Sequence, residues 1–225
     1  MIHQIVESSP SFPTSGPLVC VVDEEMEIRQ SLCKLFQTAS LQVRTFKSVA
    51  EFLEQGGHQG PCCLVIDPNL PSMNGLDIQG ILIDSSDQVV CLTSHADIPT
   101  CAKAMKAGAV DYLIKPADTE TLLEAAKRAL ARSQVVLSAK TARSAAQAKF
   151  NSLTAREFGV MSRVIAGLLN KQIAAELGIA EKTIKAHRGR VMRKAGVVSV
   201  AELVKLAITA GITDSIKSNI PASRH

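Results

Sequence analysis

The sequence predicts a two-domain protein, in which a doubly wound α/β domain with a five-stranded parallel sheet precedes an all-α domain of four helices. Short β-branched runs alternate with helical patterns in the first half, and the second half contains helical patterns alone. The charge also changes sign: residues 1–125 hold seven Lys and Arg against sixteen Asp and Glu, and residues 126–225 hold eighteen against five. These counts give an acidic domain and a basic one, and a basic domain is typical of proteins that bind nucleic-acid phosphates.

Five runs of the first half have the length and composition of buried strands: residues 18–22, 42–46, 62–66, 89–92 and 112–114. Each is followed by a helical pattern, over residues 25–38, 48–54, 75–83, 98–107 and from about residue 118. Ser48 and Glu51 form a capping-box pair, and Gly108 marks a helix end. Such alternation favours a parallel sheet with helices on both faces and with ligands at the carboxyl ends of its strands.

Charged and hydroxyl side chains follow four of these strands. Asp23 and Glu24 follow the first strand, Asp67 the third, Thr93 the fourth and Lys115 the fifth. Crowded carboxylates repel one another unless a cation lies between them, so we expect an oxygen-ligand Mg²⁺ site at this edge. One carboxylate can then act as the nucleophile toward a phosphoryl group, while the hydroxyl and the ammonium hold the transferred oxygens.

The first half resembles the receiver domain of two-component response regulators, which has a flavodoxin-like fold. The motifs that carry the resemblance are VVDEE at residues 21–25, VIDPNLPSMNGLD at 65–77, LTSHAD at 92–97 and KAGAVDYLIKP at 106–116. They occur in the family's order between residue 18 and about residue 130, and they are closest to FixJ-like regulators.

The resemblance assigns a phosphoryl acceptor and a metal site. It implies that Asp67 accepts a phosphoryl group from a sensor histidine kinase, and that Asp23, Glu24, Asp67 and the backbone carbonyl of Asn69 hold Mg²⁺. The sequence departs from the family at Glu24, where most relatives have Asp, and at Pro68, which removes a backbone N–H beside the acceptor.

The resemblance also assigns the groups that respond to phosphorylation. It implies that Thr93 binds a phosphate oxygen, that Lys115 forms an ion pair with the phosphoryl group and that Tyr112 is the switch aromatic. The peptide bond between Lys115 and Pro116 is expected to be cis.

A continuous helix is predicted to leave the first domain, because residues 118–149 contain neither Gly nor Pro and are rich in Ala. Leu123, Leu130 and Leu137 recur every seven residues, as in the seam of a dimeric coiled coil, but the other seam positions hold small or polar residues. Two interpretations therefore stay open: a coiled-coil dimer helix, or a solvated single helix whose far end frays.

The second half predicts a four-helix unit. Capping-box pairs at Thr154/Glu157 and Ser199/Glu202 open the first and last helices, and Asn170 can cap the second. A glycine follows each helix: Gly167, Gly178, Gly196 and Gly211. The two central helices, with a short glycine-containing turn between them, fit a helix-turn-helix.

The third of these helices, residues 181–195, holds six Lys or Arg and a single acidic residue. Residues 153–206 resemble the LuxR-type DNA-binding domain through the stretch LTAREFGVMSRVIAGLLNKQIAAELGIAEKTIKAHRGRVMRKAGV. The resemblance places Lys185, Ala186 and Gly189 toward the bases, and its candidates for phosphate contact are Lys171, Lys182, Thr183, His187 and Arg193. Gly189 has no side chain to read a base, so we expect Lys185 and DNA shape to set specificity.

The expected boundaries are a disordered tail over residues 1–17, a receiver domain over 18–130, a helical linker over 131–150, a LuxR-type helix-turn-helix domain over 151–212 and a flexible tail over 213–225. The six cysteines all lie in the first half, without the paired spacing of a metal site, and are expected to be buried thiols.

Together these features predict a phosphorylation-dependent transcription regulator that is cytoplasmic, has no membrane segment and is not an enzyme. Its expected partners are a sensor histidine kinase, double-stranded DNA and a second copy of itself, with RNA polymerase as a further candidate. The alternative is a phosphorylation-independent transcription factor whose receiver is a dimerisation domain, and Glu24 and Pro68 favour it. An aspartyl-phosphate phosphatase is disfavoured because no second Asp stands two residues after Asp67, and a small-molecule sensor because only 3% of residues are aromatic.

Overall fold

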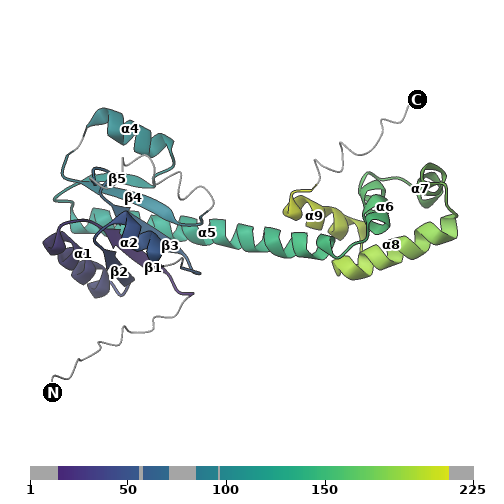
Figure 1. Cartoon of the computed structure of the whole chain (residues 1–225), viewed down its shortest axis with the longest axis horizontal. Helices are drawn as coiled ribbons and strands as arrows, with labels where there is room; N and C mark the ends of the chain where they lie inside the picture. The colour runs from purple at the N-terminus through teal and green to yellow at the C-terminus, as the bar shows by residue number, and fades with distance from the viewer. Residues whose placement is uncertain (1–14, 56–57, 71–84, 96, 213–225) are drawn as a thin grey trace, which may run out of the picture. The chain divides into compact units, whose positions relative to one another are not determined.

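A computed structural model describes residues 15–55, 58–70, 85–95 and 97–212 of the chain. The chain divides into two compact units, Met1–Leu137 and Ser138–His225 (Figure 1). The elements of the first unit are β1 (Leu18–Val22), α1 (Met26–Thr38), β2 (Gln42–Phe46), α2 (Val49–Glu54), β3 (Cys62–Ile66), β4 (Gln88–Thr93), α4 (Ile98–Lys106), β5 (Asp111–Ile114) and the first part of α5 (Thr119–Asn151). The helix predicted over residues 75–83 lies outside the described residues.

The five predicted strands are confirmed, and they form one parallel sheet in the order β2-β1-β3-β4-β5. The sheet has a hydrophobic core on each face. Phe36 of α1 and Leu122 of α5 belong to one core, whereas Val49 of α2 and Ala104 of α4 pack in the other. Helices therefore cover both faces, as the strict alternation of strands and helices predicted.

The register of the sheet brings the ends of distant strands together. Val22, the last residue of β1, lies opposite Ile66, the last residue of β3, and Thr93 of β4 lies opposite Ile114 of β5. β2 lies on one side of β1, whereas β3 and the later strands lie on the other side. The order in which the chain adds strands to the sheet therefore reverses at β1 and β3. Ligand sites in open α/β sheets form at such a switch point, at the carboxyl ends of the strands.

The capping box predicted at Ser48/Glu51 is formed only in part. The N–H of Glu51 donates to Ser48 Oγ over 3.2 Å, and Glu51 Oε2 accepts from the N–H of Lys47 over 2.8 Å. The Ser48 hydroxyl thus satisfies one backbone donor of the first turn of α2, while the Glu51 carboxylate accepts from Lys47, the residue before the cap, and not from the N–H of Ser48. The six cysteines are free thiols, and the four on strands are buried.

The first part of α5 is an integral part of the first core. Leu130 is only 7% exposed and Leu123 packs against the same cluster, so two leucines of the seven-residue repeat face this unit's own sheet. Ser133 is fully buried, and its Oγ accepts a hydrogen bond from the N–H of Cys62 over 2.9 Å. The repeat therefore reflects packing on the sheet, and these two leucines are not available to a seam between chains.

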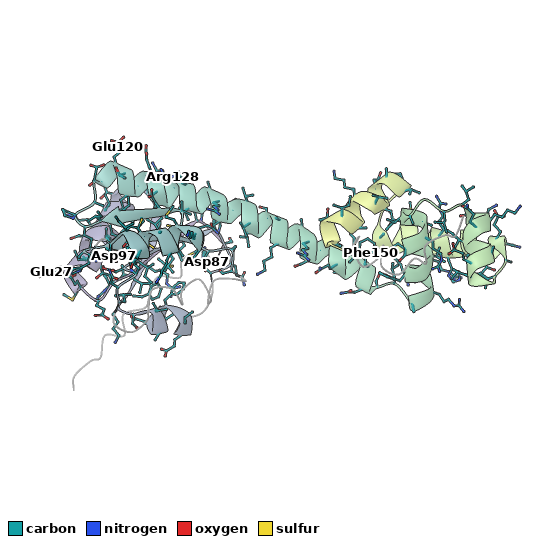
Figure 2. The ribbon with its side chains drawn as sticks, turned by 90° about the horizontal axis from the view of Figure 1, so that it is seen from above. Glu27, Asp87, Asp97, Glu120, Arg128 and Phe150 are labelled. Atoms are coloured by element: carbon teal, nitrogen blue, oxygen red, sulfur yellow. The ribbon has the colours of Figure 1, made fainter. Side chains whose placement is uncertain are left out.

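The last part of α5 belongs to the core of the second unit. Ala146 and Phe150 are buried there, and Gln147 Nε2 donates to the backbone carbonyl of Ala210 over 3.0 Å. Figure 2 marks Phe150 at this end of the helix. The predicted continuous helix is confirmed, but its far end is packed rather than frayed.

The second unit contains the four predicted helices: α6 (Ala155–Ile165), α7 (Asn170–Leu177), α8 (Glu181–Ala195) and α9 (Val200–Ala210). The capping box at Thr154/Glu157 is formed. The predicted box at Ser199/Glu202 is formed only in part: the N–H of Glu202 donates to Ser199 Oγ over 3.2 Å, but the Glu202 carboxylate accepts from the N–H of Val198, one residue before the cap. The prediction that Asn170 caps α7 is wrong. Leu169 is the cap residue, and its N–H donates to the side chain of Gln172 over 2.7 Å. No helix in the described part of the chain is both long enough and apolar enough to span a membrane.

We predict that Ser133→Ala destabilises the first unit by about 1–3 kcal/mol, because it leaves the buried N–H of Cys62 without an acceptor. Urea denaturation of the full chain measures the change. Ser144→Ala is the matched control, since Ser144 is exposed on the same helix and its replacement should change stability little. Equal stabilities of the two variants would contradict a role for this hydrogen bond.

Candidate functional site

The carboxyl edge of the sheet holds two carboxylates joined by one ammonium. Lys115 Nζ lies 2.5 Å from Asp23 Oδ2 and 3.0 Å from Asp67 Oδ2. The side chains are largely buried, with exposed fractions of 6% for Asp23, 10% for Lys115 and 14% for Asp67. Burial by itself lowers the pKa of Lys115, but the hydrogen bonds and charges of Asp23 and Asp67 outweigh burial and leave the pKa above its ordinary value. Lys115 is therefore an ammonium at neutral pH.

The loop after β1 is held from α1. Asp23 Oδ1 accepts from the N–H of Glu25 over 2.9 Å, and Arg29 donates to the backbone carbonyls of Asp23 and Glu24 over 2.7 and 2.8 Å. The Glu24 side chain is exposed, and its carboxylate makes no hydrogen bond or ion pair to any described residue. The structure thus brings Asp23 and Asp67 together but leaves the Glu24 carboxylate outside the cluster. Arg29 was missed by the sequence reasoning, since its role depends on where α1 packs.

Asn69 connects Asp67 to the end of β4. Its N–H donates to Asp67 Oδ1 over 3.0 Å, and its side-chain amide donates to Thr93 Oγ1 over 2.8 Å and to the His95 carbonyl over 3.2 Å. Thr93 is fully buried. The sequence singled out only the backbone carbonyl of Asn69, so the contact of its side chain with Thr93 is a further finding. In the sequence, the only indication of this contact was the position of the Asn69 amide, two residues after Asp67.

Tyr112 lies on β5, opposite Cys91, and packs against the core shared with α2 and α4. Its hydroxyl oxygen is buried and has no hydrogen-bond partner among the described residues. Burial, together with nearby negative groups, raises the pKa of Tyr112 above its ordinary value. The peptide bond between Lys115 and Pro116 is cis, as predicted.

The predicted cation site is only partly assembled from acidic side chains. Within the described residues, no group of three or more His, Cys, Asp or Glu is arranged to hold a metal ion. Asp23 and Asp67 nevertheless offer carboxylate oxygens at adjacent strand ends, which is the ligand chemistry that Mg²⁺ prefers. The cation between them in this structure is the ammonium of Lys115.

In the second unit, α7 and α8 form the predicted helix-turn-helix. Gly178 ends α7 in the left-handed conformation, with a φ of 65°, and the side chain of Arg188 donates to Asn170 Oδ1 over 3.2 Å. Ile184 and Val191 bury one side of α8 in the core. At about 100° per residue the opposite side of this helix carries Lys182, Ala186, Gly189 and Arg193, and these are exposed.

The remaining residues predicted to contact DNA differ in exposure. Lys171, Thr183 and Lys185 are exposed, and Lys185 Nζ is 3.7 Å from Glu181 in a surface ion pair. His187 is half-buried, and its Nδ1 is buried without a hydrogen-bond partner in the described part of the chain. The residues predicted to contact DNA are therefore exposed, except His187, which lies nearer to the core.

Two ion pairs hold α7 and α8 against α6. Lys194 Nζ is 2.6 Å from the carboxylate of Glu157, and Arg163 is 2.7 Å from Glu176. Because Glu157 accepts from Lys194 and from the N–H of Thr154, its pKa is lowered from 4.5 to about 2. A single carboxylate thus both caps α6 and holds the end of α8.

The two units match two protein families. Residues 19–127 match the response regulator receiver domain, and residues 151–207 match the bacterial regulatory proteins of the luxR family. The chain belongs to the response regulators that join a receiver domain to a LuxR-type DNA-binding domain, which are transcription regulators.

Individual relatives cover nearly the whole chain. Nodulation protein W of Bradyrhizobium diazoefficiens is 39% identical over 198 residues, which is 87% of each chain. Transcriptional regulatory protein FixJ of Azorhizobium caulinodans is 35% identical over 202 residues, 89% of this chain and 95% of FixJ. The solved structure of response regulator StyR is 41% identical, covers 85% of this chain and 98% of StyR, and superposes with a TM-score of 0.75. The FixJ-like resemblance is confirmed, and the phosphorylation-independent alternative is not favoured.

We predict that the second unit loses stability as the pH falls from about 4.5 toward 2. A carboxyl group whose pKa is lowered on folding stabilises the folded state above its ordinary pKa, and this contribution disappears as the group becomes protonated in the folded state. Amide NMR signals of α6 and α8 in the full chain, followed in urea at pH 6 and pH 3, measure it. Glu157→Gln should reduce the difference between the two pH values, and an unchanged difference would contradict the assignment.

Proposed function

We propose that this response regulator is switched by transfer of a phosphoryl group from a phosphohistidine of a sensor histidine kinase to Asp67. The observation that carries the proposal is the contact of Lys115 with both Asp23 and Asp67 at one sheet edge. Of the two carboxylates, Asp67 is the more exposed, at 14% against 6%, so it is the one that a bulky donor can reach.

The chemistry needs one nucleophile and two groups that hold oxygens. A carboxylate oxygen of Asp67 attacks phosphorus, the bond between phosphorus and the kinase imidazole nitrogen breaks, and that nitrogen keeps the electron pair. The Lys115 ammonium then pairs with a phosphoryl oxygen. The Thr93 hydroxyl, which accepts a hydrogen bond from the Asn69 amide in this structure, then donates to a second phosphoryl oxygen.

Asp23, Asp67 and the backbone carbonyl of Asn69 would hold Mg²⁺, and Glu24 would act through a bound water because its side chain is exposed. The bound ion would offset the negative charge of the phosphoryl oxygens. The oxygen donors of Asp23 and Asp67 fit this ion.

The output of the switch is DNA binding by α8. A phosphoryl group adds negative charge beside Asp23 and competes for Lys115 and Thr93, so the loops that these residues join must rearrange. Tyr112, whose hydroxyl has no hydrogen-bond partner in the part of the chain that the structure describes, follows Thr93 as the switch aromatic. We infer that phosphorylation favours a homodimer, which places α8 of each copy in the major groove of a two-part site.

The partners follow from this chemistry. They are a sensor histidine kinase and double-stranded DNA, which put the protein's function in the cytoplasm, and RNA polymerase is a further candidate at the bound promoter.

On α8, Lys185, Ala186 and Gly189 face the bases, and the expected phosphate contacts are Lys171, Lys182, Thr183, His187 and Arg193.

We predict that incubation with acetyl phosphate and Mg²⁺ adds the mass of one phosphoryl group to the full chain, and that Asp67→Asn abolishes the addition. Intact-mass spectrometry measures it. Asp111→Asn is the matched control, because Asp111 lies at the opposite end of β5 in an ion pair with Arg128 and should leave phosphorylation intact. Addition to Asp67→Asn, or none to the wild-type protein, would refute the proposed acceptor.

We predict that Lys185→Ala weakens binding to a preferred DNA site by about 1–3 kcal/mol while sparing mixed-sequence DNA, because Lys185 is expected to contact a guanine edge. The preferred site is selected from a random-sequence pool, and affinities are measured at one fixed salt concentration. Lys182→Ala is the comparison, since loss of a phosphate contact should weaken both duplexes alike. If Lys185→Ala weakened binding to both duplexes equally, Lys185 would instead be assigned to the contacts with the DNA phosphate backbone.

A further inference from the structure

Gly189 occupies a position where the fold gives no reason for a glycine. It is the ninth residue of α8 (Glu181–Ala195), well inside the helix. Its φ is not in the left-handed region that favours glycine. A glycine inside a helix is unfavourable relative to alanine, because it loses more conformational freedom on folding. The helix would therefore be more stable with alanine at this position.

Crowding does not explain this glycine either. A Cβ placed on Gly189 would meet no heavy atom within 4 Å. Gly108, Gly167 and Gly178 have the same open space, but each has a positive φ. The other described glycines all have neighbours within 4 Å. Neither backbone conformation nor packing therefore requires a glycine at position 189. Gly159 in α6 is also free of a positive φ and of crowding, with one ordinary contact at 3.8 Å, but of the two helix-interior glycines in the described residues only Gly189 would present its Cβ to open space.

The position of Gly189 points to a partner outside the chain. It lies on the side of α8 opposite the buried Ile184 and Val191. Ala186 lies one turn before it on the same exposed side, and Arg193 lies about one turn after it. The middle of this surface thus consists of a methyl group and a bare backbone, with cations at its margins.

We propose that Gly189 is the point of closest approach of α8 to the bases, and that the room left by its missing side chain accepts a thymine methyl group. This inference rests on the proposed DNA-binding function. Lys182 and Arg193 draw the helix toward the phosphates on either side of the groove, while Gly189 allows its backbone to come near the base edges. The thymine methyl is the apolar group that bases present in the major groove, and the Ala186 methyl supplies a matching apolar contact.

The test compares two helix-interior glycines, Gly189→Ala and Gly159→Ala, in the full chain. Gly159 lies inside α6, and a Cβ there would meet only the Arg163 guanidinium at 3.8 Å, an ordinary contact. Both variants should unfold at a higher temperature than the wild-type protein, because alanine favours the helix. Gly159→Ala should leave DNA affinity unchanged. Gly189→Ala should weaken affinity for the selected duplex on the order of tenfold, and for a mixed-sequence duplex of equal length much less.

A uracil scan of the selected duplex identifies the methyl group. Replacing each thymine by uracil in turn removes one methyl and leaves the pairing edge intact. At one position in each half-site the replacement should weaken binding of the wild-type protein, and the same replacement should have no further effect on Gly189→Ala. All measurements are made with and without acetyl phosphate and Mg²⁺, at one salt concentration.

The outcomes separate this inference from the function on which it rests. If the wild-type protein does not distinguish its selected duplex from the mixed-sequence duplex, the proposed sequence-specific DNA binding fails, and this inference fails with it. If the wild-type protein distinguishes them and Gly189→Ala binds as tightly, only the close-approach role is overturned. A uracil effect of equal size in both proteins would overturn the assignment of the methyl group to Gly189.

Discussion

Two carboxylates held side by side at the end of a buried sheet are the constraint on which the first unit depends. Asp23 and Asp67 directly follow residues that pair in the register of β1 and β3, so parallel pairing itself brings the two charges together. Like charges in a largely buried site repel, and each also loses hydration. The Lys115 ammonium, delivered from the end of β5, offsets both effects. Without this one cation, the carboxylates of Asp23 and Asp67 would lose the ion pairs that now offset their charge.

The same arrangement gives the receiver a physical basis for switching. Both groups that can hold a phosphoryl oxygen already have partners: Lys115 bonds the carboxylates, and Thr93 bonds the amide of Asn69. Under the proposed function, a phosphoryl group on Asp67 would compete for these partners and so break the contact between Asn69 and Thr93, which connects the loop after β3 to the end of β4. The buried Tyr112 hydroxyl has no hydrogen-bond partner among the described residues, and under the proposed function this aromatic side chain would be free to follow Thr93.

The second unit separates the side chains that hold the fold from those that face outward. Glu157, Arg163 and Asn170 tie α6, α7 and α8 together through ion pairs and hydrogen bonds, and α5 adds Phe150 and Gln147 to the same unit. With α8 fixed in this way, its exposed side does not have to stabilise the helix, and under the proposed function it would carry residues suited to DNA. A glycine in the middle of that side is intelligible on these terms, because the surrounding contacts hold the helix without it.

The sequence by itself determined the five strands, the alternating order and the capping boxes such as Thr154/Glu157, because these depend on hydrophobic period and on neighbours within a few residues. Tertiary structure alone decided which distant groups meet. The seven-residue leucine repeat, which includes Leu130, fits either a seam between chains or a face packed on a sheet, and only the docked helix distinguishes them. Likewise, the Asn69 amide finds Thr93 and Lys115 lies between two carboxylates because strand register, which no local pattern encodes, sets the distance between residues far apart in the chain.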